Sequence, residues 1–204
     1  MKPVALGMKR CKSFLLLLLF LANMTVFGQN GVEGEHRIKK VQFPSISIDT
    51  LFKTVGRSEL TRVRYYKTVD TVRTSYTLKF KMQRLHYQMH FDANGNLLKV
   101  GFGVKEVDVP SDTYAAMRGY LQNRFEKVKI RRMYQEYPIT SREKVHSHLK
   151  NAFQNLHLPT NQYRLLVMGK NKGGREQYVV KFDAKGGLKD LSMALPANHD
   201  RILY

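Results

Sequence analysis

HYQMHFDANGNLLKV, residues 86–100, is the stretch on which the fold prediction depends, because a second stretch of the chain matches it without a gap. That second stretch is QYVVKFDAKGGLKDL, residues 177–191, which begins 91 positions later. The identical pairs are Tyr87/Tyr178, Phe91/Phe182, Asp92/Asp183, Ala93/Ala184, Gly95/Gly186 and Leu97/Leu188. The match marks either a repeated binding loop or a repeated piece of architecture.

The centre of the match has the composition of a turn. Asp92 to Asn96 carries side-chain oxygens at alternate positions, as the start of a calcium-binding loop does. The second copy replaces Asn94 by the cation Lys185, and neither copy ends with the bidentate glutamate of such a loop. In an Asp-x-x-Gly turn, Asp accepts hydrogen bonds from the backbone ahead of it and Gly takes a positive φ. We therefore predict two turns and no metal site.

The match extends upstream of the two stretches. Pro44-Ser45 and Pro110-Ser111 lie 66 positions apart, and the apolar residues after each have the i, i+3, i+7 spacing of one helix face. These residues are Ile48, Leu51 and Val55 in the first copy, and Tyr114, Met117 and Leu121 in the second. Alternating segments typical of strands follow each one. The sequence thus predicts an α+β fold, a tandem repeat of a helix followed by antiparallel strands, with the helices packed on one face of a shared antiparallel sheet.

The second copy is longer, and an extra helix accounts for most of the difference. Thr140-Ser141-Arg142-Glu143 has the spacing of a capping box, and an apolar stripe follows it as far as Leu156. We predict this helix near residues 141–157. The expected organisation is a signal peptide at 1–28, a first repeat at 29–108 and a second repeat at 109–204.

The N-terminal region predicts export. Four basic residues precede an apolar run from Phe14 to Phe27, and small residues stand before Gln29, which is the layout of a cleaved signal peptide. The run is shorter than the roughly 20 residues of a spanning helix. The single cysteine, Cys11, lies before the run, so the mature chain would have neither disulfide nor thiolate chemistry. The expected location is the periplasm or the medium.

The charge of the chain points to an anionic partner. Lys and Arg number 35 against 16 Asp and Glu, a formal net charge of +19. Such a charge attracts polyanions, but export argues against nucleic acid. The expected partner is an acidic protein surface in the cell envelope or outside the cell, and anionic lipid or glycan stays open as an alternative.

No catalytic motif is complete. Gly101-Phe102-Gly103 begins like a dinucleotide loop but lacks its third glycine, and Gly169 to Arg175 lacks the Gly-Lys-Ser/Thr ending of a phosphate-binding loop. No Gly-x-Ser-x-Gly elbow is present. We predict no cofactor, no metal and no enzymatic activity.

Alternation divides the predicted strands into two faces. One face would turn apolar side chains toward the helices: Val63, Leu78, Phe80, Tyr87, Met89, Phe91, Val128, Ile130, Tyr178, Val180 and Phe182. The opposite face would carry the candidate partner-binding residues: Arg62, Arg64, Lys79, Lys81, Gln88, His90, Lys129, Arg131 and Lys181. A face that is merely solvated stays an alternative, because Lys and Arg are common on exposed sheets, and a register slip of one residue would exchange the faces.

The repeated pattern resembles a known family. Each copy closes on Tyr-x-x-x-Phe-Asp-x-x-Gly-x-Leu, and the second opens with Val-Pro-x-x-x-Tyr at Val109. These features resemble the exported PepSY-like proteins of bacteria, whose fold is similar to that of beta-lactamase inhibitor protein. The resemblance covers most of residues 36–191 and rests mainly on turn and core residues. They are Tyr87, Phe91, Asp92, Gly95, Leu97, Tyr178, Phe182, Asp183, Gly186, Leu188 and the stretch from Val109-Pro110 through Tyr134-Gln135-Glu136-Tyr137.

The resemblance implies a role in protein binding. Members of the wider group are propeptides or inhibitory modules of secreted proteases, and the namesake inhibitor blocks its enzyme with its open sheet face. The chain departs from the disulfide-stabilised inhibitor by having no mature cysteine, and from the family by its charge. The predicted function is an exported, non-catalytic binding or inhibitory module that uses its open, basic sheet face. The alternative is a peripheral envelope protein held on anionic lipid or glycan by general positive charge.

Overall fold

The computed structural model describes residues 34–44, 59–69, 73–141 and 145–194. These residues form one antiparallel sheet of nine strands, in which each strand pairs with the next along the chain. The strands are β1 (Gly34–Ile38), β2 (Leu60–Val69), β3 (Thr74–Met82), β4 (Leu85–Phe91), β5 (Leu97–Gly103), β6 (Lys127–Pro138), β7 (Gln162–Asn171), β8 (Gly174–Asp183) and β9 (Leu188–Met193).

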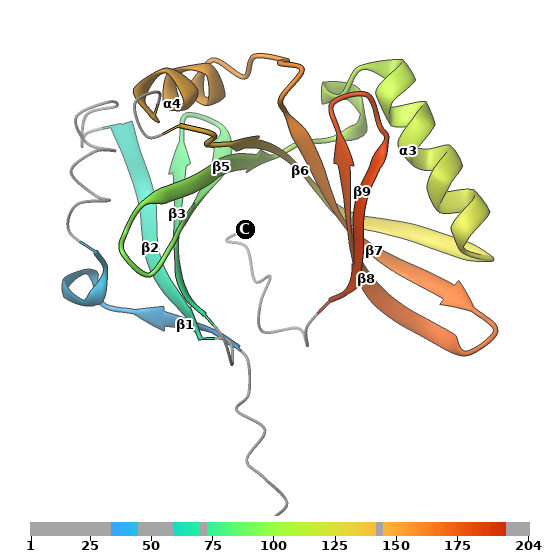
Figure 1. The fold of residues 1–204 in the computed structure, drawn as a ribbon, viewed down its shortest axis with the longest axis horizontal. Helices are drawn as coiled ribbons and strands as arrows, with labels where there is room; N and C mark the ends of the chain where they lie inside the picture. Colours follow the sequence, from blue (N-terminus) through green and yellow to red (C-terminus); the bar gives the residue numbers. More distant parts are fainter. Residues whose placement is uncertain (1–33, 45–58, 70–72, 142–144, 195–204) are drawn as a thin grey trace, which may run out of the picture. The chain divides into compact units, whose positions relative to one another are not determined.

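Two α-helices in the described residues cover one face of the sheet. Helix α3 (Ser111–Arg124) lies between β5 and β6, and α4 (Val145–Phe153) lies between β6 and β7. Figure 1 shows both on the outer side of the curved sheet. Two 3-10 turns, η2 (Lys40–Gln42) and η4 (Glu106–Asp108), complete the described elements. No helix in the described part of the chain is long and apolar enough to cross a membrane.

Each helix packs on its own cluster of apolar side chains. Leu149 of α4 belongs to a cluster built mainly on β3, β4 and β5, whereas Met117 and Leu121 of α3 belong to a cluster built on β6, β7 and β8. All the apolar positions predicted to turn toward the helices lie in these two clusters or pack against them. The predicted assignment of these residues to the helix-covered face is therefore confirmed.

The two Asp-x-x-Gly stretches are turns, as predicted. Asp92 Oδ1 accepts hydrogen bonds from the backbone N–H groups two and four residues ahead, at 2.9 and 2.8 Å. Asp183 Oδ1 accepts the equivalent two bonds, both at 2.8 Å. Gly95 and Gly186 follow with φ of +80° and +85°. A left-handed residue at this position is what allows the chain to reverse.

The predicted tandem repeat of a helix followed by strands is wrong. The described residues form a single sheet, running from β1 to β9, with α3 and α4 inserted before and after β6. The first predicted helix, with Ile48, Leu51 and Val55, lies outside the described residues. The matched sequences led to this error because they encode a hairpin turn and its adjacent core positions, which do not determine what precedes them.

The second turn contacts the beginning of α3. The hydroxyl of Thr113 donates a hydrogen bond to the carbonyl of Ala184, at 3.0 Å. A Cβ added to Gly186 would lie 2.7 Å from the Thr113 carbonyl oxygen and 2.8 Å from the Cβ of Ala116. The absence of a side chain at Gly186 therefore permits both the turn and its contact with the helix.

We expect Gly186→Ala to lower the free energy of unfolding by roughly 1–3 kcal/mol, because it combines a left-handed φ with a steric clash. The control is Gly119→Ala in α3, where a Cβ meets nothing within 4 Å. That substitution should raise stability by up to about 1 kcal/mol through helix propensity. Urea denaturation of both variants measures the difference, and equal stability would contradict the contact between turn and helix.

Candidate functional site

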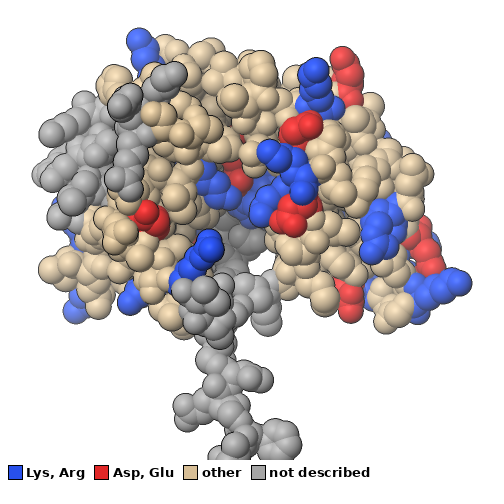
Figure 2. Space-filling model, in the orientation of Figure 1, with Lys and Arg blue, Asp and Glu red and all other residues tan. Residues whose placement is uncertain are grey.

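No described helix covers the second face of the sheet, which we call the helix-free face. Strand pairing places one row of its residues across five strands: Arg64, Lys79, Gln88, Gly101 and Glu136. The helix-free face lines the inside of the curved sheet (Figure 1). Figure 2 shows Lys, Arg, Asp and Glu side chains meeting in its central recess.

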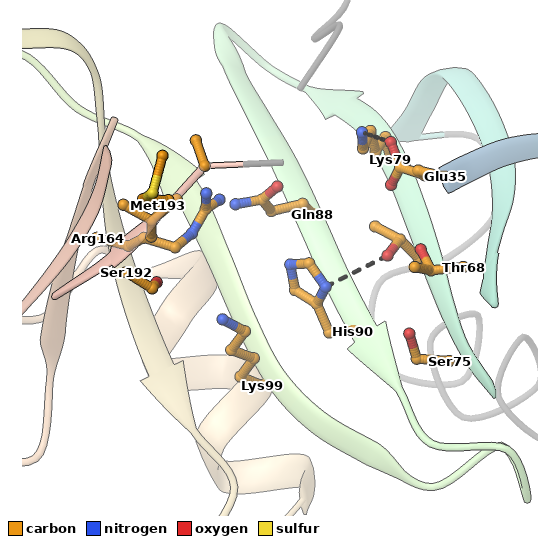
Figure 3. A pocket seen from close by; sticks show the side chains of 13 residues that line it. Glu35, Thr68, Ser75, Lys79, Gln88, His90, Lys99, Arg164, Ser192 and Met193 are labelled. Carbon is orange, nitrogen blue, oxygen red and sulfur yellow. Dashed lines mark hydrogen bonds and ion pairs between the residues drawn. The ribbon is translucent and has the colours of Figure 1, made fainter. Parts of the chain in front are cut away.

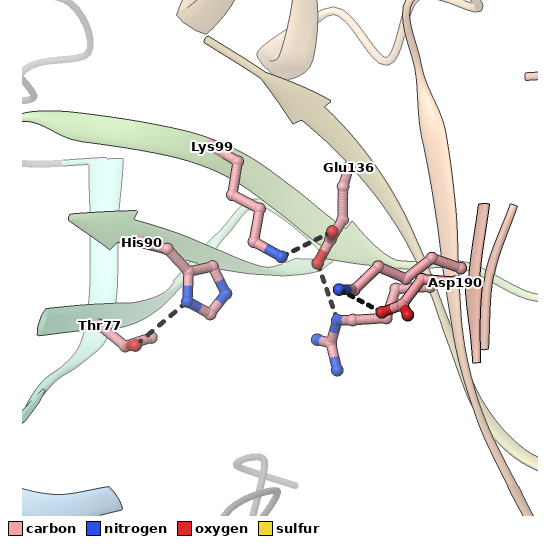
Figure 4. Close-up of polar contacts among 7 residues, drawn as sticks. Thr77, His90, Lys99, Glu136 and Asp190 are labelled. Carbon is pink, nitrogen blue, oxygen red and sulfur yellow. Dashed lines mark hydrogen bonds and ion pairs between the residues drawn. The ribbon is translucent and has the colours of Figure 1, made fainter. Parts of the chain in front are cut away.

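A second row lies beside the first on the same face. Tyr66, Thr77, His90 and Lys99 are successive partners across β2 to β5. The hydroxyl of Thr77 lies 3.3 Å from His90 Nδ1 in a hydrogen bond (Figure 4). This contact orients the ring so that its other nitrogen, Nε2, is directed away from Thr77.

One carboxylate joins two cations at the centre of the helix-free face. Glu136 accepts a hydrogen bond from Lys99 Nζ at 2.8 Å and another from Arg164 Nε at 2.8 Å (Figure 4). The Glu136 side chain is only 2% exposed, and those of Lys99 and Arg164 are 26% and 10% exposed. The guanidinium of Arg164 also lies 4.2 Å from the centroid of the Tyr134 ring. Three strands, β5, β6 and β7, thus meet at a single carboxylate.

The ion pairs determine the charge states of this cluster. Burial by itself raises the pKa of Glu136, but the attraction of Arg164 and Lys99 outweighs it and holds that pKa at about 2. Burial lowers the pKa of Lys99, and its ion pair with Glu136 opposes this shift only in part. Glu136 is therefore ionised throughout the neutral range.

Strand β1 supplies a second buried ion pair. Lys79 Nζ donates to Glu35 at 2.6 Å, and the two side chains are 6% and 7% exposed. The same ammonium group lies 4.4 Å from the centroid of the Tyr66 ring. A third, more exposed pair joins Lys181 to Asp190 at 2.9 Å.

A cavity of about 300 Å³ lies on the helix-free face between these pairs. Gln88, His90, Lys99 and Arg164 line it from the central strands, and Met193 faces them from β9 (Figure 3). Further lining residues are Glu35, Thr68, Ser75, Thr77, Lys79, Val179, Ser192 and Ala194.

Two buried nitrogen atoms at this cavity have no hydrogen-bond partner among the described residues. They are Gln88 Nε2 and His90 Nε2. Gln88 as a whole is only 5% exposed. Buried polar groups usually find a partner, so these two atoms mark the cavity as a place where a ligand group can bind.

The structure brings four of the predicted site residues to the centre of the helix-free face. Lys79, Gln88 and His90 line the cavity, and Lys181 forms its ion pair with Asp190 nearby. Lys79 and Gln88 are buried rather than solvated, which the alternation pattern alone did not indicate. Arg64 is the half-buried neighbour of Lys79 across the β2–β3 ladder.

The other predicted residues lie farther along the strands. Lys81 is half-buried on β3, opposite His86. Arg62 is exposed at an irregularity of the β2–β3 pairing and has φ of +53°. Lys129 is exposed opposite Met168, and Arg131 is exposed where the β6–β7 register shifts. These four residues lie along the strands away from the central cluster, and none of them belongs to its ion pairs.

Sequence reasoning missed the acidic members and two of the cations. They are Glu35, Lys99, Glu136, Arg164 and Asp190. Period-two alternation applied to β5 and β7 would have placed Lys99 and Arg164 on the helix-free face. The ion pair between Glu136 and Lys99 could not be predicted from the sequence, because α3 separates β5 from β6 along the chain.

Comparison with known proteins shows the fold and no family. No protein-family model and no curated protein matches the chain. A presumed periplasmic protein of Bacteroides eggerthii is similar at 11% sequence identity, with a TM-score of 0.51, over 76% of this chain and 91% of that one. A DUF2874 family protein of Bacteroides uniformis is similar at 12% identity, with a TM-score of 0.50, over 76% and 91%.

A BLIP-like protein of Bacteroides fragilis matches at 16% identity, with a TM-score of 0.47, over 79% of this chain and 92% of that one. At the identities of the first two structures, the likeness shows a common fold. The resemblance to PepSY-like proteins stays a prediction.

We expect Glu136→Gln to lower the free energy of unfolding by about 3–5 kcal/mol, because it leaves two buried cations without their carboxylate. Asp190→Asn is the control. The side chains of Asp190 and Lys181 are 44% and 37% exposed, so their ion pair should contribute less than about 1 kcal/mol. Chemical denaturation at neutral pH compares the two variants with the wild type. A loss no larger in Glu136→Gln than in Asp190→Asn would contradict a structural role for the cluster.

Acid should remove the stabilisation that the ionised Glu136 carboxylate contributes. The pKa of Glu136 is lowered from 4.5 to about 2 on folding, so its stabilisation is present above pH 4.5 and is lost as pH falls toward 2. A shift of this size corresponds to roughly 3 kcal/mol. Stability measured from pH 6 to pH 2 should fall more steeply for the wild type than for Glu136→Gln, and parallel curves would contradict the shift.

Proposed function

We propose that the chain is an exported, non-catalytic module that binds a protein partner on its helix-free face. The observation that carries the proposal is the combination on this face of a cavity, buried charges and unpartnered buried nitrogen atoms. A face that was merely solvated would not need buried polar groups, because burying them costs free energy. The family resemblance in the sequence supports the same kind of role.

The buried and exposed charges of this face have different roles in the proposal. Lys79, Lys99 and Arg164 are held by carboxylates and present a rigid, preformed surface. Arg62, Lys129 and Arg131 are exposed and free to attract an acidic surface over a longer range. Charges of the second kind mainly raise the rate of encounter and select among partners.

The state of the acidic groups supports a non-catalytic role. Glu136, with a pKa of about 2, is bonded to two cations and would neither donate nor accept a proton readily at neutral pH. Glu35 is bonded to Lys79 in the same way. Within the described residues, no group of three or more His, Cys, Asp or Glu side chains could hold a metal ion.

The proposed export rests on the N-terminal sequence. Residues 1–28 have the pattern of a cleaved leader, and they lie outside the described residues. An exported chain would find its acidic partner in the envelope or outside the cell.

We expect the triple variant Arg62→Glu, Lys129→Glu, Arg131→Glu to lose a partner that the wild type captures from an envelope extract at about physiological salt. The control, Arg118→Glu, Lys150→Glu, Lys185→Glu, changes the same number of exposed charges on the helix side and should retain it. Quantitative mass spectrometry of the captured proteins compares the three baits, after circular dichroism has shown equal folding.

If both triple variants lost the partner equally, and binding disappeared evenly as salt rose, the proposal that the partner binds specifically to the helix-free face would be refuted. That outcome would instead favour attachment to anionic lipid or glycan by general charge, because exposed charges interact only within a Debye length of about 8 Å at physiological salt. Retention by both variants would contradict an electrostatic role for Arg62, Lys129 and Arg131.

A further inference from the structure

The unpartnered nitrogen atoms of the central cavity define the ligand group that it can hold. Gln88 Nε2 is a buried donor with no hydrogen-bond partner among the described residues, and His90 Nε2 is buried and without a partner as well. Gln88 and His90 are alternate residues of β4, so both side chains project from the same face into the cavity (Figure 3). A fitting ligand group therefore has an acceptor for Gln88 and a hydrogen-bonding complement for His90.

His90 offers either a donor or an acceptor at Nε2, according to its tautomer. Its Nδ1 forms a hydrogen bond with the Thr77 hydroxyl at 3.3 Å. When the hydroxyl donates, Nε2 carries the ring proton and is a donor, and when Nδ1 carries the proton, Nε2 is an acceptor. A carboxamide complements both tautomers, because it has a carbonyl oxygen and an NH₂ group side by side. A carboxylate complements only the first tautomer.

The charged side chains of the cavity favour a neutral ligand group over an anion. Among the described residues, the cations that line the cavity are Lys79, Lys99 and Arg164, and each is already bonded to a carboxylate of the protein. An anionic ligand would compete with Glu35 and Glu136 for these cations. It would also meet the carboxylate of Glu35, which lines the same cavity. A neutral carboxamide leaves the ion pairs intact.

Hydroxyl groups supply acceptors for an amide nitrogen. Thr68 and Ser75 line the cavity as cross-strand partners on β2 and β3, and Ser192 lines it from β9. A hydroxyl oxygen accepts hydrogen bonds as well as donating one. The cavity wall thus holds donors for a carbonyl oxygen and acceptors for an NH₂ group, which is the combination that a carboxamide needs.

Gly101 keeps Glu136 in place beside the cavity. It lies between Gln88 and Glu136 in the row across β4, β5 and β6. A Cβ at this position would lie 2.9 Å from the Gln135 carbonyl oxygen and 3.1 Å from Glu136 Cγ. A side chain at residue 101 would therefore displace the carboxylate that holds two of the cations of the cavity.

We propose that this cavity binds the side-chain carboxamide of an Asn or Gln residue of the partner. The carbonyl oxygen of that group accepts a hydrogen bond from Gln88 Nε2, and its oxygen or its NH₂ group is bonded to His90 Nε2. This inference rests on the proposed function and specifies the group that the centre of the helix-free face recognises. A cavity of about 300 Å³ is at the small end of ligand sites and has room for one such side chain. A neutral centre also fits the general pattern of protein interfaces, whose cores are depleted in charged residues.

The charge state of His90 gives the bound group a pH signature. Burial lowers the pKa of His90 well below its usual value. The charges of Lys99, Arg164 and Lys79 lower this pKa further, and the charge of Glu136 opposes them. The ring is thus uncharged from about pH 6.5 to pH 8, and a neutral ligand should bind with the same affinity across this range. A carboxylate would bind more tightly as the pH falls, because it raises the pKa of the ring.

The test compares small compounds with the same number of non-hydrogen atoms. Propionamide carries the side-chain carboxamide, N-methylacetamide carries the peptide group, and propionate is the anionic isostere. Each is titrated into the ¹⁵N-labelled mature protein, and NMR follows the side-chain signals of Gln88 and His90. We expect saturable shifts with propionamide, at an affinity that is equal at pH 6.5 and pH 8. N-methylacetamide and propionate should bind about tenfold more weakly or worse, because each lacks the NH₂ group.

Variants locate the site. Gln88→Met and His90→Phe should each weaken binding of propionamide roughly five- to tenfold, the effect of losing one hydrogen bond. The matched controls are Gln154→Met and His157→Phe, because Gln154 and His157 are exposed outside the cavity. Backbone amide spectra confirm folding, and either cavity variant alone is sufficient if the other does not fold.

Several results would overturn the proposal: no saturable shift with propionamide, binding of N-methylacetamide or propionate as tight as that of propionamide, or unchanged affinity in the cavity variants. If one of them occurs while the charge-reversed triple variant still loses its partner, the helix-free face binds proteins without a carboxamide site. If propionamide binds but Gln88→Met captures the partner as well as the wild type does, the partner does not supply the carboxamide, and the proposal fails in that case too.

Discussion

The middle of the structure depends on the two ion pairs that the Glu136 carboxylate forms. It is bonded to Lys99 on β5 and Arg164 on β7, and it projects from β6, which lies between them. The apolar cluster under α4 is built mainly on strands before β6, and the cluster under α3 is built mainly on β6 and the strands after it. The buried ion pairs therefore join the two parts of the sheet on the face that the helices do not cover.

The two faces of the sheet are stabilised by different physical effects. On the helix side, packed apolar residues such as Leu78 and Val180 are removed from water, which is the dominant favourable term in folding. On the helix-free face, Lys79 and Glu136 are almost as deeply buried but depend on specific partners. The first face tolerates changes that keep volume and apolar character. The second face requires defined charges and defined geometry.

Local patterns predicted the parts of the fold that local physics determines. Alternation assigned Leu78, Phe80 and Phe182 to the core face, and the Asp-x-x-Gly pattern identified both turns. The architecture could not be predicted in this way, because two similar hairpin turns are compatible with either a repeated unit or one continuous sheet. Which strands become neighbours across an inserted helix depends on contacts between residues far apart in the chain, as in the β5–β6 pairing.

The candidate site shows the same division. Alternation put Lys79, Gln88 and His90 on one face, but it presented that face as an open basic surface and did not indicate that Lys79 and Gln88 are buried. The carboxylates that pair with these cations are far from them in the sequence. Glu35 lies 44 residues from Lys79, and Glu136 lies 37 residues from Lys99. Only the folded sheet brings them together. The formal charge of the chain, +19, therefore says little about the charge at the centre of the face, where cations and carboxylates are paired.

The burial of the central cluster costs free energy that its ion pairs have to offset. A buried ion pair is weak evidence for stability, because apolar residues of similar volume often stabilise a protein equally well or better. Gly101 and the unpartnered nitrogen atoms of Gln88 and His90 add further cost at the same place. Costs of this kind are typical of functional sites, where a ligand group can supply hydrogen bonds that the protein does not make itself.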